Sequence, residues 1–134
     1  MGPQRGDPFE TSPHVLRLPG RTSSPRAARD FVTGVIAGWG ARPARDVGLA
    51  TSEVVTNAVL HAGGDIAVRV RRVDGHARVE VHDDDPRPPA VRRYEPGAIG
   101  GAGMNLVAAL AACWGVTTVE GDGKVVWFDI EVQR

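Results

Sequence analysis

The sequence has 134 residues, and its 16 basic and 16 acidic side chains give a formal net charge of zero at pH 7. A chain of this length can form one domain with a substantial hydrophobic core. Because the charges balance, we expect neither nucleic acid nor a membrane as a direct partner. No apolar segment opens the chain, and the longest apolar run, 106–112, is too short to cross a bilayer, so we expect a soluble cytoplasmic protein.

The N-terminal part of the chain separates into a tail and the start of a domain. Residues 1–13 are rich in proline, glycine and charge and predict a loose tail, which leaves 14–134 as a single domain. The segment HVLRLPG alternates apolar and polar residues and predicts a short first strand. A serine followed by Pro25 is typical of a helix start, and helical apolar spacing continues to a stop at Gly40.

A second helix and a hairpin follow. The helix is expected from about residue 43 to residue 62, ended by Gly63 and Gly64. The apolar pattern then changes to period two in DIAVRVRRV and HARVEVHD. These two segments are joined by Asp74-Gly75, a pair typical of the tight turn in an antiparallel hairpin.

The C-terminal half begins with a long irregular segment. Residues 83–103 are rich in proline and glycine and predict a loop rather than a regular element. We expect a helix over 104–115 and a closing hairpin over 116–132. Cys113 lies in an apolar run, so we expect a packed core thiol rather than a reactive one. This order of elements predicts an α+β fold, a two-layer sandwich with helices on one face of a mixed, mainly antiparallel sheet.

The second helix carries an unusual line of polar residues. Glu53, Asn57 and His61 are spaced by four, so they lie within an arc of roughly 80° on a helix that has no other charged residue between 47 and 62. They can form a hydrogen-bonded core cluster or one wall of a pocket. In a pocket, the amide oxygen suits a hard metal ion, the imidazole a phosphate, and the carboxylate the role of a base.

Three consecutive aspartates end the second strand of the hairpin. Asp83 directly follows an apolar alternating strand and can point inward, whereas Asp84 and Asp85 are expected in water. A solvated turn is the alternative for all three. They do not form a helix-loop-helix calcium site, because the sixth position of that loop would be Pro88 and the twelfth Tyr94.

A glycine-rich segment, GGAGMNLV, precedes the third expected helix. Gly101 and Gly103 would lie at its N-terminus, where free N–H groups and the helix dipole favour an anion; a flexible helix entry is the alternative. The segment lacks the third glycine of a dinucleotide fingerprint and the G-K-[ST] of a P-loop. The histidines and the cysteine show no zinc spacing, and the sequence has no G-x-S-x-G motif.

In this order and spacing, the three motifs resemble those of the GHKL ATPase superfamily, shared by gyrase, the ninety-kilodalton heat-shock chaperone, sensor histidine kinases and the mismatch-repair ATPase. The ExxxNxxxH line resembles the N box, and Asp83 matches the aspartate of the first glycine box. GGAGMNLV resembles the second glycine box and GDGKVVWFDIEV the closing strands. The resemblance covers about residues 14–132 and implies the histidine-kinase-like (Bergerat) ATPase fold.

Within the superfamily, the chain most resembles the small anti-sigma factor serine kinases, which hold a sigma factor and phosphorylate an anti-anti-sigma protein of the STAS type. Its length fits this subgroup, because we expect no dimerisation helix or second domain. The resemblance implies ATP and Mg²⁺ as ligands and is compatible with a homodimer. The alternatives are an ATP-binding regulatory switch without phosphotransfer and a detached histidine-kinase catalytic domain.

The resemblance also implies roles for individual residues. Asn57 would ligate Mg²⁺, His61 would approach the phosphates, and Asp83 would accept a hydrogen bond from the amine of adenine. Glu53 would orient or deprotonate the attacking hydroxyl. Residues 86–103 would form a lid, and the residues near the phosphates would be Gly101, Gly103 and Met104.

Two positions depart from the superfamily pattern. The first glycine box reads DDDPR and has neither of its usual glycines. Val125 stands where many relatives have a threonine near adenine, which would remove one hydrogen-bonding group from the base site.

Overall fold

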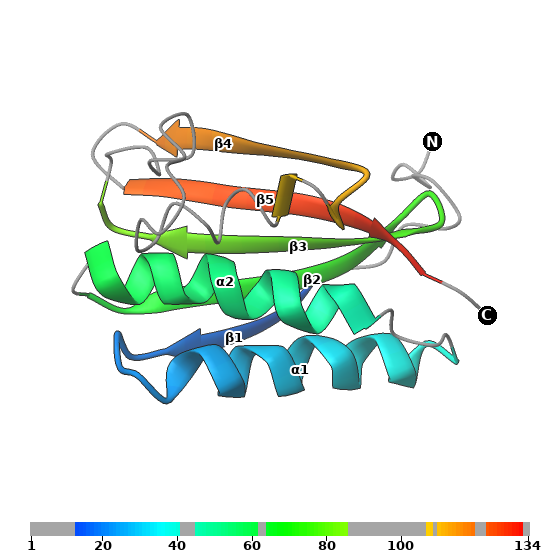
Figure 1. The fold of residues 1–134 in the computed structure, drawn as a ribbon, viewed down its shortest axis with the longest axis horizontal. Helices are drawn as coiled ribbons and strands as arrows, with labels where there is room; N and C mark the ends of the chain where they lie inside the picture. Colours follow the sequence, from blue (N-terminus) through cyan, green and yellow to red (C-terminus); the bar gives the residue numbers. More distant parts are fainter. Residues whose placement is uncertain are drawn as a thin grey trace, which may run out of the picture.

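The computed structural model describes residues 13–40, 45–61, 64–85, 107–108, 110–119 and 123–132, without the side chains of residues 45, 46, 61 and 119. A five-stranded antiparallel sheet carries two helices on one face, which confirms the expected two-layer α+β class (Figure 1). None of the described helices is long and apolar enough to span a membrane.

The sheet has the strand order β1-β2-β3-β5-β4, and all four pairings between neighbouring strands are antiparallel. The helix α1 packs over β1 and β2, and α2 packs over β2, β3 and β5. The two helices also pack against each other. The elements are β1 (His14–Leu18), α1 (Ser24–Gly38), α2 (Arg45–His61), β2 (Ile66–Val73), β3 (His76–Asp83), β4 (Cys113–Val119) and β5 (Gly123–Glu131).

The hydrophobic core lies between the helices and the sheet. We call the sheet face that packs against α1 and α2 the inner face, and the opposite one the outer face. Alternate residues of a strand point to opposite faces, so β3 places its valines inward while their neighbours point outward. The helix α1 contributes a stripe at a spacing of four. The fully buried side chains at this interface include Val32, Ile36, Val68, Val70, Val79, Val81 and Phe128.

The register between β3 and β5 determines which side chains share a face. Val81 pairs with Val126, and Asp83 pairs with Lys124 two residues further along. Both pairs therefore lie on the inner face. Arg78 pairs with Asp129, which is an odd number of residues away from these positions on each strand, so that pair lies on the outer face.

The hairpin turn predicted before β3 and the helix stop predicted at Gly40 are both present. Asp74 and Gly75 adopt positive φ angles of 48° and 83°, as a two-residue hairpin turn requires. Ser24 is the first residue of α1 rather than its N-cap, because Ser23 takes that position without a side-chain hydrogen bond, so the predicted serine cap is wrong. Pro25 lies in the first turn, and Gly40, just past the end of α1, has a φ of 76°.

The third helix expected over 104–115 is wrong at its C-terminal end. Cys113, Trp114 and Gly115 begin β4, where Cys113 pairs with Asp129 of β5. Trp114 faces the core, and Cys113 points outward and is exposed, so the expectation of a core thiol is also wrong. Pairing with β5 overrides the helical preference of this alanine-rich stretch. Residues 104–106 and most of the long loop lie outside the described residues.

Candidate functional site

The helix α2 places two residues of the predicted polar line. Asn57 is 8% exposed and lies between the buried Val54 and Ala58 on the side of α2 that faces the sheet. Glu53 lies one helical turn earlier and is half-buried. The backbone of His61 continues the line as the last residue of α2, and its side chain lies outside the description. The structure thus places a buried amide and a partly accessible carboxylate on adjacent turns.

Three segments converge at the end of the molecule that holds the C-terminus of α2, the end of β3 and the start of β5 (Figure 1, left). Gly123 opens β5 with a φ of 86°, and a Cβ atom there would overlap the carbonyl oxygen of Asp83. Gly64, just after α2, lies so close to Asp84 that a Cβ atom would overlap its carboxylate. Gly123 therefore allows the backbone to approach the end of β3, whereas Gly64 meets only the exposed side chain of Asp84.

A buried ion pair lies at this end of the sheet. The Nζ atom of Lys124 donates to Oδ1 of Asp83 over 3.0 Å and to the carbonyl oxygen of Asp85, also over 3.0 Å. The backbone N–H of Asp85 donates to the same Oδ1 over 2.9 Å. The side chains of Lys124 and Asp83 are 6% and 2% exposed. Asp83 therefore points inward, as predicted, and it is already paired with a cation.

The expectation that Asp85 lies in water is wrong. Asp84 is exposed, but Asp85 is only 9% exposed. Its backbone supplies both a donor to Asp83 and an acceptor to Lys124, which draws the residue against the end of the sheet. The inward position of Asp83 could be read from strand alternation, whereas this local closure depends on a residue 39 positions away.

Val125, the second departure noted in the sequence, lies on the opposite face of the sheet from Asp83. Val125 pairs with His82, so it points to the outer face, and Lys124 occupies the position beside Asp83. The sequence reasoning missed Lys124. The alternation of Val126, Phe128 and Ile130 toward the core carried the signal, because it places residue 124 on the same face.

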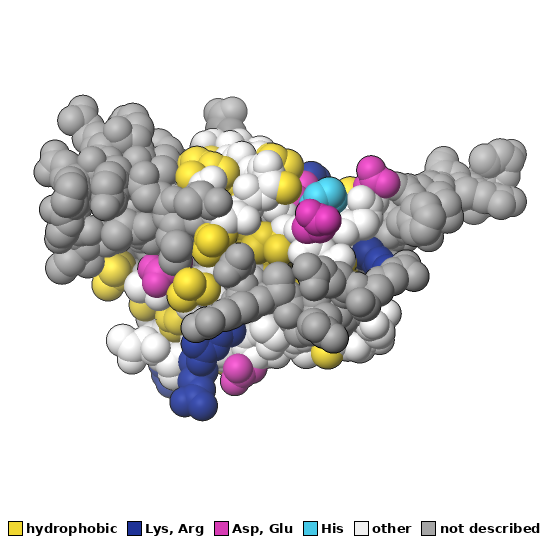
Figure 2. Space-filling view, turned by 45° about the vertical axis from the view of Figure 1, so that its right-hand side comes forward, with side chains coloured by type: hydrophobic (Ala, Val, Ile, Leu, Met, Phe, Trp, Pro, Cys, Tyr) yellow, Lys and Arg dark blue, Asp and Glu magenta, His cyan; other side chains and the backbone are white. Residues whose placement is uncertain are grey.

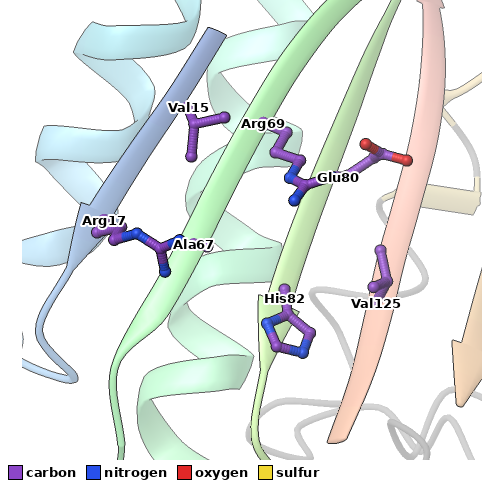
Figure 3. Close-up of a pocket in the computed structure, with 7 residues that line it drawn as sticks. All are labelled: Val15, Arg17, Ala67, Arg69, Glu80, His82 and Val125. Carbon is purple, nitrogen blue, oxygen red and sulfur yellow. The ribbon is translucent and has the colours of Figure 1, made fainter. Parts of the chain in front are cut away.

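A pocket of about 370 Å³ lies on the outer face of the sheet, with both helices behind the strands in this view (Figure 3). It does not include Glu53, Asn57 or Asp83, so it is separate from the predicted site. Charged side chains from β1, β2 and β3 point into it beside small apolar ones. The lining residues are Val15, Arg17, Ala67, Arg69, Glu80, His82 and Val125.

The surface in Figure 2 shows acidic and basic side chains on one face, in keeping with the balanced charge.

A second ion pair joins β3 and β5 on the outer face. Arg78 donates from Nε and from one terminal nitrogen to the two carboxylate oxygens of Asp129, over 2.7 and 2.8 Å. Its guanidinium carbon also lies 4.6 Å from the ring centroid of Trp127. The thiol of Cys113 donates to the same carboxylate over 3.3 Å. Both carboxylate oxygens of Asp129 thus accept hydrogen bonds, as in a structural bidentate ion pair.

The pKa values in this outer cluster follow from its contacts. Burial alone would raise the pKa of Asp129, but hydrogen bonds from Arg78 and Cys113 and the charge of Arg78 more than offset it, so the pKa lies below its ordinary value. Desolvation of the sulfur and the hydrogen bond to Asp129 raise the pKa of the Cys113 thiol. The thiol is therefore held in its protonated, less reactive form.

The described residues also bear on metal binding. In the part of the chain that the structure describes, no group of three His, Cys, Asp or Glu side chains could hold a metal ion. Mg²⁺ at nucleotide sites is held by one or two protein ligands together with the phosphates, rather than by a cage of protein side chains. A single buried amide such as Asn57 fits that kind of site, in which the metal arrives with its nucleotide.

Comparison with known families decides the family. The model of the histidine kinase-like ATPase domain matches residues 18–130, a range that contains Glu53, Asn57, Asp83 and Lys124. The chain belongs to this family. A search of curated proteins finds no match.

One solved structure shows the same fold, and a second one is only similar. The RsbU and RsbW domains of Rv1364c from Mycobacterium tuberculosis align with 92% of this chain at a TM-score of 0.66 and 22% identity. The chain spans about a third of that protein, 33% of its length. The histidine kinase domain of the Erythrobacter litoralis EL346 blue-light activated histidine kinase aligns with 63% of this chain and 42% of its own, at 34% identity and a TM-score of 0.47.

Proposed function

We propose that this histidine kinase-like ATPase domain binds ATP with Mg²⁺ and acts as a cytoplasmic anti-sigma factor and serine/threonine protein kinase. It would sequester a sigma factor and phosphorylate an anti-anti-sigma partner of the STAS type. The observation that carries the proposal is the buried Asn57 on α2, one turn after Glu53, on a helix that ends where the buried Asp83 lies. The same sequence motifs carry the resemblance to the anti-sigma kinases.

The proposed roles follow from the chemistry of these groups. The amide oxygen of Asn57 is a hard ligand for Mg²⁺, and burial holds it in one orientation. The bound metal would neutralise charge on the phosphates. The carboxylate of Glu53, half-buried one turn away, can accept a proton from a serine hydroxyl, which has almost no nucleophilic form at neutral pH. Asp83 would accept a hydrogen bond from the amine of adenine. The proposed phosphate contacts of His61, Gly101, Gly103 and Met104 lie outside the described side chains.

Binding is tested first, by calorimetric titration of ATP, ADP and GTP with and without Mg²⁺. We expect Asn57→Ala to lose the Mg²⁺-dependent part of ATP affinity while the circular dichroism spectrum stays native. Thr56→Ala is the matched control, because the hydroxyl of Thr56 bonds to the carbonyl oxygen of Ser52 within α2. Unfolding of Asn57→Ala alone would instead identify the polar line as a core cluster.

Catalysis is tested by phosphate transfer to a cognate anti-anti-sigma protein. Removal of a positioned base costs about 10²–10⁴-fold in rate, so Glu53→Ala should transfer far more slowly while binding ATP normally. A wild type that binds a sigma factor but transfers no phosphate would be a regulatory switch. Transfer to a histidine of a separate protein would identify a detached histidine-kinase domain.

A further inference from the structure

The inference concerns Lys124, the only lysine in the sequence. All the other side chains among the 16 lysine and arginine residues are arginines. Lysine is among the residues that are almost never fully buried unless paired, yet Lys124 is only 5% exposed. The one lysine of the sequence therefore lies at a buried position, and every other basic side chain is an arginine.

The contacts of Lys124 explain why an ammonium is suited to this position. An ammonium is a compact cation with three donors that point in different directions, whereas a guanidinium presents a planar fork. Nζ uses two of its donors, one toward Oδ1 of Asp83 and one toward the carbonyl oxygen of Asp85. Among the described residues no third acceptor bonds to Nζ, so one N–H can donate to another group beside the Asp83 carboxylate.

We propose that Lys124 is a second base-contacting residue, which donates its third N–H to the ring nitrogen N1 of adenine while Asp83 accepts from the neighbouring amine. This inference rests on the proposed ATP site. The edge of adenine presents an acceptor next to a donor, and the Asp83–Lys124 pair presents the complementary donor and acceptor on one buried surface. Both charges stay paired, so the base meets a site that is neutral overall.

The pair also changes the discrimination between purines. A lone carboxylate opposite guanine would face the carbonyl oxygen O6, and this like-polarity contact disfavours guanine. In the same register the N1–H of guanine would face the N–H of Lys124, so this donor–donor contact adds to the discrimination against guanine. Removal of Lys124 should therefore reduce ATP affinity more than GTP affinity. A residue with a purely structural role would reduce both by the same factor.

The test combines base analogues with variants and measures affinity by calorimetry with Mg²⁺ present. Wild-type protein should bind 1-deaza-ATP, which lacks N1, about tenfold or more weakly than ATP, and 7-deaza-ATP as well as ATP. Lys124→Met should lose about tenfold for ATP and nothing further for 1-deaza-ATP. Its ATP-to-GTP affinity ratio should fall below that of the wild type.

A control variant and a comparison on the wild type support the test. Arg78→Met removes a cation from the other ion pair on the same two strands and should leave all affinity ratios unchanged. If Lys124→Met fails to fold, the comparison of ATP with 1-deaza-ATP on the wild type decides alone. Equal affinity for these two nucleotides, or tighter ATP binding by Lys124→Met, would overturn the inference and leave ATP binding intact. Absence of binding by any nucleotide would overturn the proposed function as well.

Discussion

Strands β3 and β5 hold two ion pairs between directly opposed residues, and the pairs lie on opposite faces of the sheet. On the outer face, Arg78 meets Asp129 through two parallel hydrogen bonds and lies over Trp127. On the inner face, Lys124 reaches one oxygen of Asp83 and one backbone carbonyl. The outer carboxylate accepts at both oxygens, whereas the inner ammonium bonds to two acceptors among the described residues. One strand pair thus carries a bidentate structural contact on one face and, on the other, the contact that we propose meets the base.

The inner pair should matter most for stability when one partner is lost. Asp83→Ala would leave the ammonium of Lys124 buried without its counter-ion, which costs about 3–5 kcal/mol of unfolding free energy. The double variant Asp83→Ala with Lys124→Met should recover part of this loss because it removes the unpaired charge. Urea unfolding measures both. Equal stability of the single and double variants would mean that the charge of Lys124 finds water or another partner.

The glycine that brings β5 against Asp83 should have the next largest effect. Gly123→Ala places a side chain at a φ of 86° and against the carbonyl oxygen of Asp83, for a cost of about 1–3 kcal/mol. Gly75→Ala is the matched control, because Gly75 has a similar φ of 83° and no neighbouring atom within 4 Å. Thermal unfolding should rank Gly123→Ala below Gly75→Ala. The same cost at both positions would show that the close approach at Asp83 adds nothing.

The Arg78–Asp129 pair should contribute less to the unfolding free energy than the inner pair, and its contribution should depend on pH. Asp129→Asn removes a charge-assisted bidentate contact whose arginine is 26% exposed, so we expect a loss of about 1–2 kcal/mol at pH 7. The pKa of Asp129 is lower in the folded protein than its ordinary value of 3.8. Its contribution is therefore complete above pH 3.8 and is lost as pH falls through the folded pKa.

Urea titrations at pH 7 and below pH 3.8 should show this dependence as a shrinking difference between wild type and Asp129→Asn. A difference that stays constant with pH would assign the loss to packing rather than to charge.

Cys113 should show the smallest effect. It is exposed, so Cys113→Ser should change the unfolding free energy by less than about 0.5 kcal/mol. Its reaction with a thiol reagent at neutral pH should be slower than that of free cysteine, because its pKa is raised. Asp129→Asn removes one cause of that shift and should speed the reaction. An unchanged rate in this variant would separate the thiol from the ion pair.

Much of the framework could be predicted because it depends on local patterns. The alternation of β3 predicted the inward Asp83, Asp74-Gly75 predicted the turn, and helical spacing predicted both described helices. Cys113 was misplaced because an alanine-rich segment has helical preference until β5 pairs with it. Lys124 was missed for a related reason. Its importance comes from contact with Asp83, a residue 41 positions earlier, and no local pattern reports that contact.

Because the sequence has a single lysine, cleavage after that residue can report local unfolding. A protease that cleaves only after lysine has one target in the sequence, the bond between Lys124 and Val125 near the start of β5. That bond lies in a strand paired on both sides, so cleavage requires the sheet to open there. When opening is fast relative to cleavage, the rate of cutting follows the population of the open form. One digestion, without any label, can then measure how strongly a ligand holds this end of the sheet closed.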